Sequence, residues 1–144
     1  MTEVLFYTHA DDKLRTACQL SAKALARQMR VMILTADPAL TDKVSRQLWS
    51  VPSIGFFPHC RAGDKLAAVT PIIVDHVAEP VPHDQVLINL RDQTPPAFSR
   101  FQRLIEIVGL DEEDRAAARE RFRFYRDRGY EIITHQLGES RGSG

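Results

Sequence analysis

The sequence predicts a single α/β domain in which a mostly parallel sheet is flanked by helices. Strand-like and helix-like segments alternate from the start of the chain, which is typical of parallel sheets with right-handed crossovers. Its 144 residues, 44% hydrophobic and 26% charged, suit one globular domain. A fold of this size buries roughly 68 to 70% of the unfolded surface, so its core needs no disulfide or metal. We expect one domain over residues 1–137 and a flexible C-terminal tail over 138–144.

The first third of the chain supplies strand, helix, strand and helix in that order. Residues 4–7 form a short β-rich run, and apolar residues at helical spacing follow over 17–29. The apolar run 31–34 predicts a second buried strand. A helix is then expected over 38–49, because Asp and Pro precede it as a start signal.

The middle of the chain is less regular. Proline and glycine interrupt residues 50–69, which predicts a loop that carries aromatic side chains. Residues 69–74 and 86–90 predict two further strands, and Pro95-Pro96 ends this strand pattern.

Three more elements are expected towards the C-terminus. Apolar spacing predicts a helix over 97–108, with Gly109 as its C-terminal cap. Acidic residues 111–114 predict the start of another helix, since the helix dipole favours negative charge there, and Gly129 ends that helix. Residues 130–134 alternate like a last strand.

Charge and cysteine content exclude several classes of protein. Nineteen basic residues balance nineteen acidic ones, which argues against a protein that binds DNA mainly through many phosphate contacts. Cys18 and Cys60 lie outside any zinc-binding spacing, so we expect free thiols. The aliphatic runs are only of strand length, and the N-terminus has no basic region followed by an apolar one. We therefore expect a soluble, cytoplasmic protein.

The alternation of strands and helices is Rossmann-like, but the loop after the first strand, residues 7–12, contains no glycine. A nucleotide site needs glycine there so that backbone N–H groups can approach phosphate, so we expect a fold without a nucleotide-binding glycine loop. Asp11, Asp12 and Asp37 leave a magnesium site open, although helix N-caps explain these acids as well.

Catalytic motifs are absent from the sequence. Neither Gly-x-Ser-x-Gly nor His-Glu-x-x-His occurs. His59 and Cys60 are adjacent and point to opposite sides of an extended chain, so we expect His59 to be a hydrogen-bonded structural residue. The sequence predicts neither a catalytic residue nor a metal site.

One helix face concentrates positive charge. On a helical wheel of residues 115–128, five side chains fall within roughly 100°. They are Arg115, Arg119, Phe122, Arg123 and Arg126. Six arginines in this stretch oppose only Glu120 and Asp127, and six minus two leaves a local charge of +4. Ion pairs on a solvated face are the ordinary explanation, but these arginines have no acid between them, so we expect an external anion there.

A second feature is the aromatic segment at 48–58. It places Trp49 and Phe56 in or beside a loop, where large apolar side chains are hard to bury completely. Tryptophan and phenylalanine also serve as anchors in protein interfaces. Core packing and a partner interface both remain open.

Several features in a fixed order are similar to one known family. They are Phe6-Tyr7, Leu48-Trp49 with Phe56 and Pro58-His59, residues 87–90, residues 98–108, and Arg119-Glu120-Arg121 with Tyr125-Arg126 before Gly129. None is specific alone, but together they cover nearly the whole chain. By them the chain resembles the chi subunits of bacterial DNA polymerase III holoenzyme. The resemblance implies a Rossmann-like adaptor in DNA replication, with no enzymatic activity and no cofactor of its own.

The resemblance also implies partners. Chi subunits bind the psi subunit, which tethers them to the clamp-loader complex, and the acidic C-terminal tail of single-stranded DNA-binding protein, which ends in Phe with a free carboxylate. By position, the tail would bind at Arg115, Arg119, Phe122 and Arg123, with Arg126 adding to the positive field, and psi would bind at Trp49 and Phe56.

Two departures and three alternatives accompany these expectations. Phe122 stands where the family pattern has Tyr, and the segment between Val74 and Val86 is short. An XPD-type accessory helicase is an alternative partner for the Trp49 surface, and DNA would be contacted only indirectly. A small nucleotide- or Mg²⁺-dependent enzyme is the alternative function, followed by a direct binder of single-stranded DNA through the arginine helix.

Overall fold

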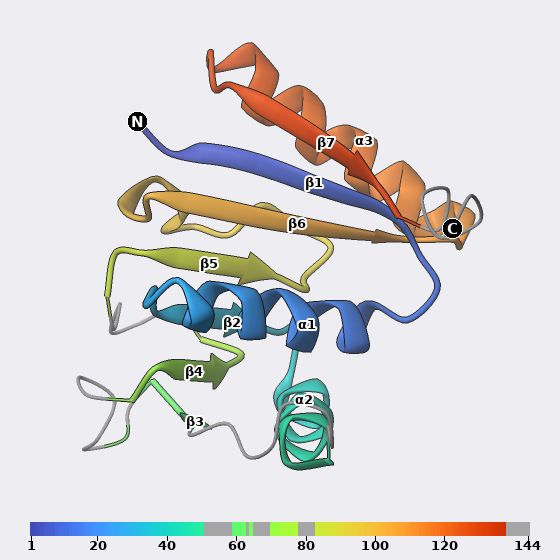
Figure 1. The fold of residues 1–144 in the computed structure, drawn as a ribbon. Coiled ribbons are helices and arrows are strands. Elements are labelled where there is room, and N and C mark those ends of the chain that lie inside the picture. The colour runs from blue at the N-terminus through green and yellow to red at the C-terminus, as the bar shows by residue number, and fades with distance from the viewer. Residues whose placement is uncertain (51–58, 63, 65–69, 78–82, 138–144) are drawn as a thin grey trace.

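The protein has a parallel sheet at its centre (Figure 1), as a computed structural model describes it for residues 1–50, 59–62, 64, 70–77 and 83–137. The strands are β1 (Glu3–Ala10), β2 (Val31–Leu34), β3 (His59–Cys60), β4 (Ile72–Asp75), β5 (Val86–Asn89), β6 (Arg103–Gly109) and β7 (Ile132–Gln136). Their order across the sheet is β3-β4-β2-β5-β6-β1-β7, and all the described pairs are parallel. The α/β fold class predicted from the sequence is confirmed.

Helices lie on both faces of the sheet (Figure 1). They are α1 (Lys13–Ala26), α2 (Pro38–Ser50), α3 (Glu112–Asp127) and a short 3-10 turn, η1 (Phe98–Arg100). Helices α1 and α2 pack on one face, and α3 packs on the other face near β1, β6 and β7. The proposed tail, 138–144, lies outside the described residues, as does most of the aromatic loop.

Alternate residues of the strands feed two separate hydrophobic clusters. On β2, Val31 and Ile33 join the cluster under α1 and α2, whereas Met32 and Leu34 join the cluster on the α3 side. A central parallel strand is buried on both faces, so its sequence is continuously apolar. This burial explains why the short run 31–34 was recognisable as a strand.

Two of the three acids that left a magnesium site open serve as helix caps. Asp12 accepts a hydrogen bond from the backbone N–H of Arg15 at 3.1 Å, and Asp37 accepts one from that of Leu40 at 2.8 Å. Such side chains satisfy N–H groups that have no partner within the helix. Among the described residues, no group of three or more Asp, Glu, His or Cys is placed to hold a metal ion.

The helix predicted over 97–108 is wrong. The chain instead makes η1 and then β6, which lies in the sheet between β5 and β1. Residues 104–108 are buried on both sides of the sheet, and a short run of this kind has apolar side chains at positions that also fit a helix. Gly109 is the last residue of β6, not a helix cap, and an added Cβ there would lie 3.4 Å from side-chain atoms of Lys13 and Asp114.

Smaller differences concern the strands at the edges. The sequence placed residues 59–60 in a loop, but they form the two-residue edge strand β3. His59 accepts or donates a hydrogen bond with the Ser45 hydroxyl at 2.8 Å, which confirms a hydrogen-bonded role. Cys18 and Cys60 are free thiols, as expected. Within the described ranges no helix combines the length and apolar character that a membrane span requires.

Candidate peptide-binding site

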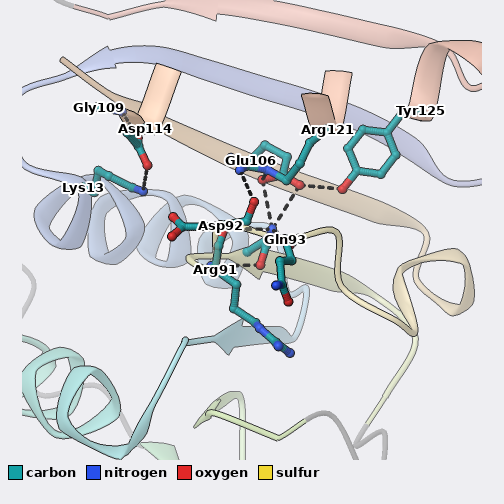
Figure 2. Close-up of polar contacts among 10 residues, drawn as sticks. Lys13, Arg91, Asp92, Gln93, Glu106, Gly109, Asp114, Arg121 and Tyr125 are labelled. Atoms are coloured by element: carbon teal, nitrogen blue, oxygen red, sulfur yellow. Dashed lines mark hydrogen bonds and ion pairs between the residues drawn. The ribbon is translucent and has the colours of Figure 1, made fainter. Parts of the chain in front are cut away.

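The position of α3 is fixed at its first turn. Asp114 accepts hydrogen bonds from the backbone N–H of Gly109 at 2.6 Å and from the Lys13 ammonium at 2.9 Å (Figure 2). Burial alone would raise the pKa of Asp114, but the Gly109 N–H and Lys13 outweigh that effect and hold the pKa below its ordinary value. Asp114 therefore links α3 to the end of β6 and to α1.

A buried polar cluster holds the middle of the same helix. Glu106 of β6 is fully buried, and it accepts hydrogen bonds from Arg121 at 2.9 Å and Tyr125 at 2.5 Å (Figure 2). The amide of Asn89 donates to both Glu106 oxygens at 3.1 Å. Arg121 also donates to the carbonyl of Asp92 at 2.7 Å. The cluster thus joins α3, β5, β6 and the segment after β5.

Burial sets the protonation behaviour of this cluster. Burial raises the pKa of Glu106, although Arg121, Tyr125 and Asn89 all favour its ionised form. Burial also raises the pKa of Tyr125, and the neighbouring Glu106 raises it further. A buried carboxylate of this kind persists only with partners, so removal of Arg121 would leave an uncompensated charge or force a proton onto Glu106.

The side of α3 that carries Arg119 borders an open pocket of about 310 Å³. The helix contributes Arg115, Ala118, Arg119 and Phe122. The sheet contributes apolar and small groups, namely Phe6, Thr8, Val108, Gly109 and Thr134, together with His9. The pocket therefore lies between α3 and the strands β1, β6 and β7.

Phe122 joins this pocket to the core. Its ring makes an edge contact with Phe6 at a centroid distance of 5.5 Å, and Phe6 in turn contacts Tyr125 at 6.1 Å. Because Tyr125 is held by Glu106, the apolar wall of the pocket rests on the buried cluster. Aromatic edge contacts of this kind prefer a defined geometry, so the wall is formed before any ligand arrives.

The two pocket arginines are accessible. Arg119 makes an exposed ion pair with Glu112 at 2.9 Å, and more than half of both side chains is open to solvent. Among the described residues, no hydrogen bond or ion pair involves the side chain of Arg115. Exposed pairs contribute little to stability, so Arg119 can exchange Glu112 for another carboxylate.

His9 lies at the pocket rim in an unusual backbone conformation. Its φ of 62° is in the left-handed region, where non-glycine residues are uncommon. This residue coincides with an irregularity in the pairing of β1 with β6, between Tyr7 and Ala10. Irregular pairing of this kind is common next to functional sites, and His9 is one of the residues that line the pocket.

The structure brings together three of the five residues predicted for the anion site. Arg115, Arg119 and Phe122 line the pocket, whereas Arg123 and Arg126 do not. Arg123 pairs with Glu120, and Arg126 contacts Asp127.

The expectation that no acid lies among these arginines was wrong, for two reasons. Glu112 precedes the stretch considered on the helical wheel, and its side chain reaches Arg119 over seven residues. Glu120 was counted in the local charge, but Arg123 at i+3 is close enough to pair with it.

Other pocket residues could not be found from the wheel. Phe6, Val108 and Thr134 come from three strands that are far apart in the sequence, and only the sheet order makes them neighbours. The second predicted surface is not described: Trp49 lies in α2, but its side chain is outside the described part, and Phe56 is outside it entirely.

The pocket can bind a group that is both apolar and anionic. Phe6, Val108 and Phe122 offer an apolar slot, and Arg115 and Arg119 stand beside it. A guanidinium can bind a carboxylate through two parallel hydrogen bonds, which gives both charge and orientation. The C-terminus of a peptide that ends in a large apolar residue combines these two properties.

Comparison with known proteins identifies the family. Residues 1–133 match the family described as "DNA polymerase III chi subunit, HolC". The DNA polymerase III subunit chi of Pseudomonas aeruginosa is 36% identical over 141 residues, which cover 95% of this chain and 98% of that protein. The proteins of the same name from Haemophilus influenzae and Escherichia coli are 27% and 26% identical, covering 85% and 81% of this chain and 85% and 80% of their own lengths.

These relatives are named as a subunit of a polymerase and not as an enzyme in their own right, which agrees with the absence of catalytic motifs from the sequence. The chain belongs to the DNA polymerase III chi subunit family and is an accessory subunit of DNA replication.

Proposed function

We propose that this chain is a non-enzymatic adaptor that binds the acidic C-terminal tail of single-stranded DNA-binding protein in the α3 pocket. The observation that carries the proposal is the placement of Arg115 and Arg119 beside the apolar wall formed by Phe6 and Phe122. A terminal Phe fits the apolar wall, and its free carboxylate reaches Arg119. Such an adaptor is located in the cytoplasm.

The remaining arginines have a lesser role in this proposal. Arg123 and Arg126 are exposed and lie outside the pocket, so they contribute to the positive field that attracts the acidic part of the tail. Exposed charges of this kind mainly speed encounter. Arg119, in contrast, makes a directed pair with the carboxylate, typically about 1.5 to 3 kcal/mol per charged hydrogen bond.

Isothermal titration calorimetry tests the tail site. The complete tail peptide and a peptide that lacks the final Phe are titrated against the wild-type chain, Arg119→Ala and Arg126→Ala. We expect the truncated peptide to bind far more weakly, and Arg119→Ala to lose more affinity than Arg126→Ala. Equal affinity for both peptides would mean that the pocket binds anions in general, and it would contradict the proposal.

We also propose that psi binds at Trp49 and Phe56, which connects the chain to the clamp loader. The support is the family membership together with the apolar character of this segment. Trp49→Ala should weaken the psi complex by about 2 kcal/mol or more if this residue is an interface anchor. The segment would belong to the core instead if the isolated Trp49→Ala chain unfolds while a folded Phe56→Ala variant keeps its full affinity for psi. An XPD-type helicase added as competitor for psi tests whether the two share the surface.

A further inference from the structure

A second cavity lies on the opposite face of the sheet from the peptide pocket. It has a volume of about 140 Å³ and is enclosed by the C-terminal half of α1 and by β1, β5 and β6. Its floor is apolar and includes Leu5 and Ile105. We refer to it as the α1 cavity.

Three cations surround the α1 cavity. Lys23 lies in α1, Arg27 caps the C-terminal end of α1 one turn later, and Arg103 is the first residue of β6. Arg103 pairs with Glu3 at 3.0 Å, but among the described residues no carboxylate pairs with Lys23 or Arg27. Within the described part of the chain these two cations therefore have no ion-pair partner and the cavity has no acidic side chain in its lining, which favours an anionic ligand that also has an apolar part.

One aromatic side chain lines the same cavity and stacks on a second one beside it. Tyr7 lines it, and the Tyr7 ring stacks on His135 of the neighbouring strand, with a centroid distance of 4.8 Å and an angle of 21° between the rings. Arg27 and Arg103 line the cavity together with Tyr7. Burial raises the pKa of the Tyr7 phenol, and the positive charges of Arg103 and Arg27 oppose that shift. Figure 1 shows no helix in front of this face of β1 and β7 among the described residues.

The edge of this surface is open. His135 and Ile133 are exposed on β7, the edge strand of the sheet. The aromatic and apolar surface therefore continues from the cavity to the sheet edge, with the cations of α1 along one side. An aromatic surface with cations beside it is the arrangement on which single-stranded nucleic acids stack their bases and place their phosphates.

We propose that the α1 cavity and the Tyr7–His135 pair bind a short stretch of single-stranded nucleic acid, with one base against Tyr7 and the adjacent phosphates on Lys23 and Arg27. The cavity has room for one flat group, and the paired bases of a duplex cannot enter it. An acidic peptide has carboxylates but no repeated aromatic group next to each charge, so it matches this surface less well. The site does not overlap the α3 pocket, and it stands or falls independently of tail binding.

Few phosphates are contacted in this arrangement, which is compatible with a chain of zero net charge. Two neutralised phosphates on a single strand predict a slope of about −1.4 for the logarithm of the binding constant against the logarithm of salt concentration. Nucleic-acid binding at the α1 cavity is therefore expected to be weak when no other contact supports it. It becomes useful when the tail of a DNA-bound protein already holds the chain near the strand.

Fluorescence anisotropy of a labelled short thymidine oligonucleotide tests the proposal on the full chain. We expect Lys23→Ala/Arg27→Ala to weaken binding by about tenfold at low salt and to abolish most of the salt slope. Tyr7→Leu should also weaken binding by about tenfold, because one stacked base is lost. The matched control is Arg15→Ala/Lys43→Ala, which removes two exposed cations from α1 and α2 outside the cavity and should bind as the wild type does.

Competition separates the possible ligands. Unlabelled oligonucleotide should displace the probe far better than inorganic tripolyphosphate, and a saturating acidic tail peptide should leave the probe bound. Displacement by tripolyphosphate at equal concentration, displacement by the tail peptide, or an equal loss in the Arg15→Ala/Lys43→Ala control would each overturn the proposal. If Tyr7→Leu does not fold, the Lys23→Ala/Arg27→Ala variant still tests the proposal, because both of its side chains are exposed.

Discussion

Arg119 and Arg121 lie two residues apart on α3, but they work in opposite environments. Arg121 and its partner Glu106 are 3% and 0% exposed, whereas Arg119 and its partner Glu112 are 56% and 71% exposed. The two ion-pair distances are both 2.9 Å. Distance therefore says nothing about function here, and solvent access separates the two pairs.

The difference assigns a separate task to each side of the helix. The inward side, with Arg121 and Tyr125, orders α3 against β6, because a buried charge tolerates no loss of partner. The outward side, with Arg119, keeps a pair that an incoming carboxylate can replace at small cost. A rigid helix with replaceable surface partners is a suitable support for peptide binding.

The largest expected change in the free energy of unfolding follows from the removal of the Arg121 side chain. We expect Arg121→Ala to lower the free energy of unfolding by about 3 to 5 kcal/mol, since it leaves Glu106 buried without its cation. Urea denaturation followed by circular dichroism measures this change. Arg119→Ala is the matched control, and it should alter the free energy of unfolding by no more than about 0.5 kcal/mol.

The double variant Glu106→Leu/Arg121→Met sharpens this result. Apolar residues of similar size in place of both partners should cost much less than the single change, because no charge is left without a partner. If Arg121→Ala and Arg119→Ala destabilise the chain equally, the contrast between the inward and outward sides fails.

The sequence predicted the outward side better than the inward side. Arg115, Arg119 and Phe122 share a helical face, and this regularity lies within one continuous segment. The buried cluster joins Asn89, Glu106, Arg121 and Tyr125 across three elements, and residue types alone do not indicate which buried acid will meet which arginine. Moreover, the sequence pattern predicts a helix over 97–108, whereas Glu106 lies in the strand β6, so the neighbours of Glu106 could not be inferred.

The fold itself was predictable where two faces of a strand or one face of a helix leave a clear pattern. Helices α1 and α2 have capping acids and apolar stripes, the short strand β2 is continuously apolar, and β5 is apolar apart from its last residue, Asn89. The run 104–108 is apolar apart from Glu106, and the preceding Phe98 and Phe101 extend its spacing into an apparent helical period. The place of these residues in the middle of the sheet determines that they form a strand, and the local sequence pattern does not distinguish a strand from a helix.

A smaller effect is expected at the first turn of α3. Asp114→Asn removes the charged bond from Lys13 and weakens the one from Gly109, so we expect a loss of about 1 to 2 kcal/mol at neutral pH. The pKa of Asp114 is lower in the folded chain than in the unfolded chain. Its ionised form therefore stabilises the fold above about pH 4, and this contribution is lost as the pH falls through the folded-state pKa.

Thermal unfolding measured from neutral pH down to the acid range checks this behaviour. The difference in melting temperature between the wild type and Asp114→Asn should be constant near neutrality and should shrink below about pH 4. Lys13→Met is the companion variant, since it removes the same ion pair from the other side. A difference that persists unchanged into acid would mean that Asp114 acts through packing and not through its charge.

The smallest effect concerns Glu112, and it tests whether the outward pair is truly replaceable. Glu112 holds Arg119 at 2.9 Å in the free chain, so a peptide carboxylate must displace it. We expect Glu112→Gln to strengthen binding of the Phe-terminated acidic tail peptide by about two- to fivefold, because it removes a competing charge and repulsion of the acidic tail. Glu113→Gln is the matched control: it removes the same charge one residue away, where the structure places no contact with Arg119.

Calorimetry with both variants separates the two contributions, since general repulsion changes in both and competition for Arg119 changes only in Glu112→Gln. Equal gains would show that charge alone matters, and an affinity loss in Glu112→Gln would mean that Glu112 orients Arg119 for the peptide and does not compete with it.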